Sequence, residues 1–237
     1  MKNLFITATD TDAGKTFVAC ALTHALVMSN KRVSTYKPIA AGCDQIAGVL
    51  VNEDAKLLSD FANCEQNISE VNPIALVEPI APHIAAARIN RTISLDEIML
   101  GFEQVLSLNA DVNITEGAGG WRLPLSINAT KTTYLSDFAI DTKQDVVLVV
   151  NMKLGCLNHA LLTYQAIIAD GLNCIAWIAN NASDQPMSNL SANITSLEQL
   201  LPVPKIAQLS YYADTTMSLH DKICAAANEI DLTPLFT

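Results

Sequence analysis

Gly14, Lys15 and Thr16 follow a short apolar run and precede an apolar pattern with helical spacing. In a strand–turn–helix setting, a glycine lets the backbone curl around a phosphate, and the helix N-terminus adds partial positive charge. Lys15 would reach the β- and γ-phosphates of a nucleotide, and the Thr16 hydroxyl would bind Mg²⁺. The full phosphate-loop pattern requires glycine where Thr9 stands, so the motif predicts phosphate binding only together with its surroundings.

Lys37 lies in the tripeptide Tyr36-Lys37-Pro38, at the end of the second apolar run. Doubly wound sheets bind ligands beyond the carboxyl ends of their strands, which is the edge where the glycine-containing loop lies. Lys37 is therefore a candidate second cation for the phosphates. Considered alone, it is better interpreted as an exposed surface lysine.

Two acidic residues are candidates for holding a metal ion at this edge. Asp54 opens a predicted helix, where an acidic residue also serves as a cap or opposes the helix dipole, and spacing does not separate these roles. Glu116 ends a buried strand and precedes Gly117-Ala118-Gly119-Gly120. Glycines there permit close backbone approach to a ligand, which favours a functional glutamate over an incidental one in a tight turn.

A further candidate segment reads Lys153-Leu154-Gly155-Cys156-Leu157-Asn158-His159 and precedes another helical pattern. Such a helix start suits a carboxylate, because its amides and dipole attract anions. A solvated loop capped by Asn158 is the alternative. The isolated His83 and His159 are assigned structural roles.

Short apolar runs alternate with longer helical patterns along the whole chain. Strands are predicted at residues 4–6, 33–36, 112–115, 146–150, 174–179 and, more weakly, 203–207; helices are predicted after residue 16 and at about 54–62, 94–108, 158–170, 187–200 and 216–229. Uninterrupted apolar strands suit a parallel sheet buried on both faces, and the alternation implies βαβ crossovers. We predict an α/β fold with a single doubly wound, mostly parallel sheet and helices on both faces, in one domain over residues 1–237.

Two segments do not fit this alternation. Residues from about 70 to 92 contain prolines and are predicted to form an irregular lid or loop around a site. The last few residues are expected to form a tail.

Composition restricts the class of protein. The 237 residues are 50% hydrophobic, and a formal net charge of -10 with 14 Lys and Arg argues against nucleic-acid or anionic-membrane partners. The densest apolar run is far shorter than the ~20 residues of a membrane span, and no signal-peptide pattern opens the sequence. The six cysteines form no C-x-x-C pair and are expected to be reduced thiols in a cytoplasmic protein.

Seven segments together resemble the dethiobiotin synthetases, in order and over nearly the whole chain: TATDTDAGKT, YKPIAAG, NEDA, VNPIALVEPIAPHIAA, EGAGGW, VVNMKLGCLNHALLT and WIANN. This resemblance implies a P-loop NTPase-like fold and an ATP- and Mg²⁺-dependent ligase of biotin biosynthesis. The family joins CO₂ to 7,8-diaminopelargonate through a carbamate and a carbamic–phosphoric anhydride, giving dethiobiotin, ADP and phosphate. Bringing the carbamate and the triphosphate together requires local cations in this acidic protein.

The resemblance also implies roles for individual residues. Thr11, Lys15 and Lys37 would surround the reacting groups as catalytic residues, and Thr16, Asp54 and Glu116 would bind Mg²⁺. The nucleotide site would comprise Asp12, Ala13, Gly14, Lys15, Thr16, Phe17, Asp54, Glu116, Gly117, Ala118, Gly119, Asn180, Asn181, Ser210 and Tyr211, with Asn180 recognising adenine. The substrate site would comprise Thr11, Lys37, Ala41, Gly155, Cys156, Leu157 and Asn158, the last four receiving the substrate carboxylate across a two-fold homodimer interface.

Four departures from the family pattern concern this site. Ala8 replaces a glycine, Asp12 replaces the usual glutamate, Ala41 replaces a small hydroxyl residue, and residues 206–210 replace the pattern L-G-x-I-P. None removes a phosphate cation or a metal ligand, so activity is expected. The last departure bears on the adenine-side contacts and thus on nucleotide preference.

Three other functions would use a related nucleotide domain. ATP-gated partitioning and division-site switches carry a second lysine early in the loop, where Asp10 stands, and lack YKP and KLGCLNHA. Glutamine-dependent amidotransferases need a glutaminase domain, for which 237 residues leave no room. Lys37 beside the loop argues against a non-catalytic nucleotide-binding module. The ligase is therefore the expected function.

Overall fold

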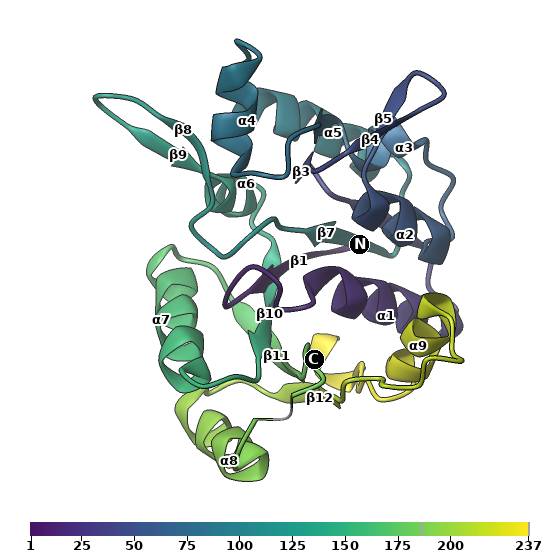
Figure 1. Cartoon of the computed structure of the whole chain (residues 1–237), viewed down its shortest axis with the longest axis vertical. Coiled ribbons are helices and arrows are strands. Elements are labelled where there is room, and N and C mark those ends of the chain that lie inside the picture. Colours follow the sequence, from purple (N-terminus) through teal and green to yellow (C-terminus); the bar gives the residue numbers. More distant parts are fainter. Residues whose placement is uncertain (186, 237) are drawn as a thin grey trace.

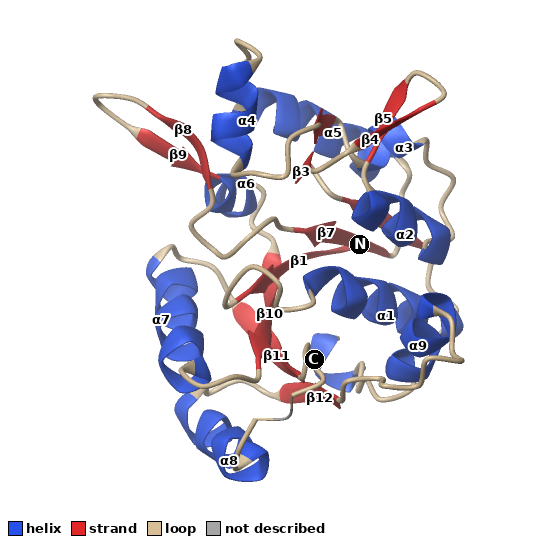
Figure 2. Ribbon diagram, viewed as in Figure 1, coloured by secondary structure: helices blue, strands red, loops and turns tan. Residues whose placement is uncertain are grey.

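The computed structural model describes residues 1–185 and 187–236, and its centre is a six-stranded parallel sheet (Figures 1 and 2). The strands run in the order β12-β11-β10-β1-β7-β2. Their bounds are β1 (Lys2–Ala8), β2 (Val33–Tyr36), β7 (Val112–Glu116), β10 (Asp145–Asn151), β11 (Cys174–Asn180) and β12 (Lys205–Leu209). Every neighbouring pair is parallel, which confirms the predicted α/β fold.

Both faces of the sheet are covered by helices. One face packs against α1 (Lys15–Met28), α2 (Glu53–Phe61) and α9 (Leu219–Ala227); the other packs against α5 (Leu95–Ser107), α6 (Leu135–Asp141), α7 (Cys156–Ala169) and α8 (Leu190–Leu200). Alternate residues of β10 separate the two cores, since Val147 and Val149 join the first and Leu148 joins the second. This two-sided burial explains why the strand is apolar without interruption.

The order of the strands brings distant loops to one edge. β1 lies in the middle, between β10 and β7, and the chain reaches β2 before it returns to form β7. The carboxyl ends of parallel strands meet at the same edge, so the loops that follow β1, β2, β7 and β10 lie near one another. Figure 1 shows the loop after β1 turning directly into α1 at this edge.

The Pro-containing segment is more regular than predicted. It holds α3 (Ile68–Val71), β6 (Ile74–Leu76) and α4 (Pro82–Arg88), and β6 pairs in parallel with β3 (Ile39–Ala41). The expectation of an irregular loop is therefore wrong for most of it. Within the segment, residues 72–73, 77–81 and 89–92 lie outside helices and strands.

Two hairpins extend from the sheet edge that carries these elements (Figure 2). They are formed by β4 (Asp44–Ile46) with β5 (Val49–Val51), and by β8 (Pro124–Ile127) with β9 (Thr132–Tyr134). At the other end of the sequence, the short 3₁₀ helix η1 (Thr233–Leu235) buries Leu235 completely, so the expected tail is wrong for these residues.

None of the helices in the described ranges is long and apolar enough to span a bilayer.

Candidate active site

The loop between β1 and α1 has the backbone of a phosphate-binding turn. Gly14 has φ +76° and directly precedes the first residue of α1, so the turn needs the conformational freedom of glycine. A Cβ atom on Gly14 would lie 2.3 Å from Nδ2 of Asn180, so a side chain there would displace the Asn180 amide. The loop is tied to the sheet by the Thr9 amide, which donates to the carbonyl of Val149 at 3.0 Å.

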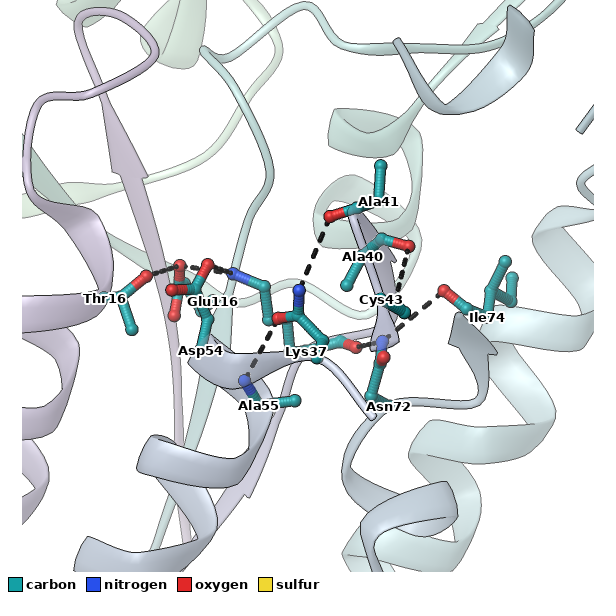
Figure 3. A network of polar contacts seen from close by, with 11 residues as sticks. Thr16, Lys37, Ala40, Ala41, Cys43, Asp54, Ala55, Asn72, Ile74 and Glu116 are labelled. Atoms are coloured by element: carbon teal, nitrogen blue, oxygen red, sulfur yellow. Dashed lines mark hydrogen bonds and ion pairs between the residues drawn. The ribbon is translucent and has the colours of Figure 1, made fainter. Parts of the chain in front are cut away.

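Three side chains from different parts of the sequence meet at Glu116 (Figure 3). The ammonium of Lys37 donates to Oε1 of Glu116 at 2.7 Å, and the Thr16 hydroxyl donates to the same oxygen at 2.8 Å. Lys37 also donates to Oδ2 of Asp54 at 3.0 Å. Lys37 is only 4% exposed and Glu116 only 1%, so the interpretation of Lys37 as a surface lysine is wrong.

Asp54 reaches this cluster because Asn52 caps the helix that carries it. Oδ1 of Asn52 accepts from the amide of Ala55 at 3.2 Å, whereas Asp54 lies in the first turn of α2. The cap is therefore provided by another residue, and the Asp54 carboxylate is left to face Lys37. Its side chain remains half-exposed toward the cavity.

The two lysines of the cluster have opposite shifts in pKa. Burial disfavours the charged form of Lys37, but the adjacent carboxylates of Glu116 and Asp54 outweigh it, and the pKa of Lys37 is raised. Burial dominates at Lys15, and its pKa is lowered, although Glu116 opposes the change. Lys37 is therefore a permanent cation at neutral pH, whereas the charge of Lys15 depends more strongly on its surroundings.

These groups form one wall of a cavity of about 750 Å³. The predicted site residues that line it are Thr11, Asp12, Gly14, Lys15, Thr16, Lys37, Ala41, Asp54, Glu116, Ala118 and Gly119. The rest of the wall is largely apolar and is built from Ile39, Ala40, Pro79, Ile80, Ala81, Pro82 and Leu123. The cavity therefore combines cations and oxygen ligands with an aliphatic surface.

A smaller cavity of about 280 Å³ lies on the other side of the same turn, and Gly14 lines both. Predicted residues lining it are Phe17, Asn180, Asn181, Ser210 and Tyr211. The Asn180 amide donates to the carbonyl of Ala13 at 2.8 Å, so this side chain connects β11 to the phosphate loop. The rings of Phe17 and Tyr212 are 5.7 Å apart and supply an aromatic wall. A flat base fits such a slot.

Several lining residues were missed by the sequence reasoning. They are Ile39, Ala40, Asn52, Pro79, Ile80, Ala81, Pro82 and Leu123 in the larger cavity, and Ala182, Tyr212, Leu219 and Lys222 in the smaller one. The prolines carried a usable signal, since the segment around them was predicted to lie near a site. Lys222 carried none, because a lysine on an exposed helix is ordinary.

Six predicted residues line neither cavity. Ala13 is buried within the phosphate loop, where its carbonyl accepts from Asn180. Gly117 packs on the ring of Phe5, where an added Cβ would lie 3.0 Å from the nearest ring atoms. The others, Gly155, Cys156, Leu157 and Asn158, begin α7 beyond the loop after β10. That loop still contacts the phosphate loop, since Lys153 and Asp10 form an ion pair at 2.6 Å.

The oxygen atoms around Glu116 fit a divalent cation. Within the described ranges, Oε2 of Glu116 is buried without a hydrogen-bond partner. Thr16 donates its hydrogen to Oε1, which leaves its lone pairs free, and Asp54 adds a second carboxylate. Hard oxygen ligands of this kind suit Mg²⁺. The described residues contain no group of three or more His, Cys, Asp or Glu arranged for a metal, so the hydroxyl of Thr16 would be an essential ligand.

Comparisons with known proteins show the family of this chain. Residues 2–218 match the family described as "AAA domain". An ATP-dependent dethiobiotin synthetase of Alteromonas mediterranea is 46% identical, covering 89% of this chain and 93% of that protein. The corresponding protein of Cellvibrio japonicus is 43% identical, covering 99% of this chain and 97% of that protein.

Solved structures support the fold alone. A ParA family ATPase from Chlorobium tepidum TLS aligns with a TM-score of 0.51 at 12% identity, covering 100% of both chains. The septum site-determining protein MinD of Pyrococcus horikoshii, complexed with Mg-ADP, aligns with a TM-score of 0.52 at 14% identity, covering 95% of this chain and 86% of that chain. Both are nucleotide-domain folds with little sequence in common with this chain.

Proposed function

This chain belongs to the dethiobiotin synthetase family and to the AAA domain family, and we propose that the larger cavity beside Gly14 is its reaction site. The chain is accordingly an ATP-dependent cyclo-ligase of biotin biosynthesis. The reaction assigned to the cavity joins CO₂ to 7,8-diaminopelargonate and yields dethiobiotin, ADP and phosphate. The observation that carries this assignment is the gathering of Lys15, Lys37 and Glu116 with the Gly14 turn in one cavity that also has an aliphatic wall.

The nucleotide occupies both cavities in this proposal. The amides of residues 12–17 hold the phosphates, with Lys15 on the β- and γ-phosphates. The base lies in the smaller cavity between Asn180, Asn181, Ser210 and Tyr211. Because Gly14 lines both spaces, one nucleotide can extend from one to the other across the turn.

Thr16, Asp54 and Glu116 would hold Mg²⁺, which when bound neutralises charge on the phosphates. The unpartnered Oε2 of Glu116 supports this role, since a buried carboxylate oxygen without a donor calls for a cation. Ala118 and Gly119 bring the backbone after β7 close to the same end of the cavity.

The diamine lies with its aliphatic chain on the apolar wall, near Ile39, Ala41 and Leu123. One amine takes up CO₂ as a carbamate, whose oxygen forms a bond to the γ-phosphorus while the bond to the ADP oxygen breaks. The second amine then attacks the carbamate carbon and expels phosphate, which closes the ring. Lys37 and Thr11 face the meeting point of the two anions and stabilise the charge on the oxygens.

The protein is proposed to act as a cytoplasmic homodimer of one-domain chains, without nucleic-acid or membrane partners. Gly155, Leu157 and Asn158 lie outside the cavities of their own chain, which suits a contribution to the partner's substrate site. The Cys156 side chain is buried in the core of its own chain, so its role there would be to anchor the start of α7. The adjacent Leu154 is 92% exposed, as expected for a side chain that a partner covers. The net charge of -10 opposes binding to other polyanions.

Incorporation of labelled bicarbonate tests the proposed reaction. The purified protein is incubated with ATP, Mg²⁺, ¹⁴C-bicarbonate and 7,8-diaminopelargonate, and acid-stable radioactivity is measured. We expect an acid-stable product that requires both ATP and the diamine, because carbamates decompose in acid whereas a closed ureido ring does not. ATP-dependent label that appears equally without the diamine would overturn the assignment.

A further inference from the structure

The ammonium of Lys37 occupies the position between the two carboxylates assigned to the metal. It donates to Oε1 of Glu116 at 2.7 Å and to Oδ2 of Asp54 at 3.0 Å, and it is almost fully buried (Figure 3). Removing a charge from water at this depth is tolerable only when opposite charges surround it. Lys37 therefore serves as the counter-ion of both carboxylates in the ligand-free chain.

We propose that Lys37 is an internal substitute for the divalent cation, and that metal binding displaces its ammonium toward the reacting anions. This inference rests on the proposed function, since it concerns the same metal ligands. A cation held by the oxygens that Lys37 now holds, Oε1 of Glu116 and Oδ2 of Asp54, would lie where the ammonium lies. An ion about 2.1 Å from a carboxylate oxygen that also holds Lys37 would be within about 5 Å of another positive charge.

The cavity gives a displaced ammonium space to enter. Lys37, Asp54 and Glu116 all line the larger cavity together with Thr11 and Lys15. Apart from Asp54 and Glu116, the carboxylate among the lining residues is that of Asp12 in the phosphate loop, so an ammonium that leaves the pair stays near the space assigned to the γ-phosphate and the carbamate. The exchange would therefore deliver the cation to the reaction only after the metal is in place.

The rival arrangement leaves Lys37 where it is. In that case the metal would bind through Oε2 of Glu116, which is free, and Lys37 would stay on Oε1. The two arrangements differ in whether Lys37 and the metal compete. Competition is measurable without nucleotide or substrate.

The test is Mn²⁺ binding, as a paramagnetic substitute for Mg²⁺, followed by electron paramagnetic resonance of the free ion. Lys37→Met and the matched control Lys15→Met each remove one buried cation from the same cavity, but only Lys37 holds the carboxylates. We expect Lys37→Met to bind Mn²⁺ at least about tenfold more tightly than the wild type, the factor that follows if the ammonium blocks nine-tenths of the sites. Lys15→Met removes a nearby positive charge but frees no carboxylate, so its affinity for Mn²⁺ should increase clearly less. Equal gains in the two variants, or none in Lys37→Met, would overturn the exchange.

A measurement on the unaltered chain covers the case in which Lys37→Met does not fold. The wild type is treated briefly with acetic anhydride in EDTA or in saturating Mn²⁺, and acetylation of each lysine is mapped by mass spectrometry. We expect Lys37 to react at least about threefold faster with the metal, because displacement exposes its ammonium to the cavity. Unchanged protection of Lys37 would contradict the proposal. Neither measurement involves turnover, so failure of the ligase assignment would appear separately, in the bicarbonate assay.

Discussion

Nζ of Lys37 lies 2.7 Å from Oε1 of Glu116, although the two residues are 79 positions apart in the sequence. β2 and β7 are hydrogen-bonded neighbours in the sheet, and each side chain stands at the carboxyl end of its strand or directly after it. The sheet therefore fixes this contact, and the contact holds a positive and a negative group beside the phosphate loop.

Glu116→Gln should destabilise the fold as well as remove a metal ligand. The substitution leaves the buried ammonium of Lys37 with only the half-exposed Asp54, so we expect a loss of about 3 kcal/mol in the free energy of unfolding. Urea denaturation followed by circular dichroism measures it. The matched control is Asp60→Asn, which breaks the exposed Lys56–Asp60 pair and should cost no more than about 0.5 kcal/mol. Equal losses in the two variants would show that the buried Lys37–Glu116 pair stabilises the fold no more than the exposed pair does.

Gly14→Ala should abolish nucleotide binding. The new methyl group would meet Asn180 at 2.3 Å, and alanine at φ +76° is strained in addition. Gly48→Ala separates the two effects, because Gly48 has φ +85° but nothing within 4 Å of its would-be Cβ atom. Strain alone should cost about 1–2 kcal/mol of stability and leave activity intact. Calorimetric titration with ATP that finds wild-type affinity in Gly14→Ala would contradict the account.

Asn180→Asp should weaken ATP binding with little effect on the chemical step. An ionised carboxylate cannot donate to the carbonyl of Ala13, so the link between β11 and the phosphate loop is lost. We expect KM for ATP to rise about tenfold while kcat changes less than about threefold, since one buried hydrogen bond contributes on the order of 1 kcal/mol. Asn193→Asp removes a comparable amide contact, to the carbonyl of Asn189 at the start of α8, a helix that lines neither cavity, and should leave both constants unchanged.

The alkaline limit of ATP use should be set by Lys15 rather than Lys37. The pKa of Lys15 is lowered, mainly by burial, so its ammonium is the first of the two to be lost as pH rises. The pKa of Lys37 is raised, so the stability from its pairing is present at neutral pH and is lost only above the ordinary lysine range. Lys15→Arg, which stays charged, should therefore move the alkaline fall in kcat/KM for ATP to higher pH. An unchanged profile in that variant would assign the fall to another group.

The sequence was sufficient to predict the sheet and the convergence of the loops at one edge. The hydrophobic period and the alternation of strands with helices are local signals, and the rule that the carboxyl ends of parallel strands meet at one edge is general. The position of Lys37 was not predictable in the same way. A lysine after a strand is exposed or buried depending on what lies opposite, and Glu116 is opposite only once β7 has been inserted between β1 and β2. The two hairpins and α6 were missed because such short elements carry no clear period.

The apolar wall of the larger cavity was unpredictable for the same reason, since it also depends on contacts between distant parts of the chain. Pro79 and Pro82 marked a break in the helical pattern. They reach the cavity beside the phosphate loop because β6 pairs with β3, and that pairing depends on residues 35 positions apart, such as Ile39 and Ile74. Lys222, which lines the smaller cavity, lies on α9, and nothing in the sequence of α9 predicts that it packs on α1.

Release of ADP by Lys37→Gln, measured together with ATP binding in the same preparation, tests the central claim most directly. In the proposed reaction the ammonium of Lys37 stabilises the two reacting anions where they meet, so diamine-dependent turnover should fall by about 10³-fold or more while the Kd for ATP changes less than about tenfold. Diamine-dependent turnover within tenfold of the wild type, in a variant that is folded and binds ATP, would contradict it.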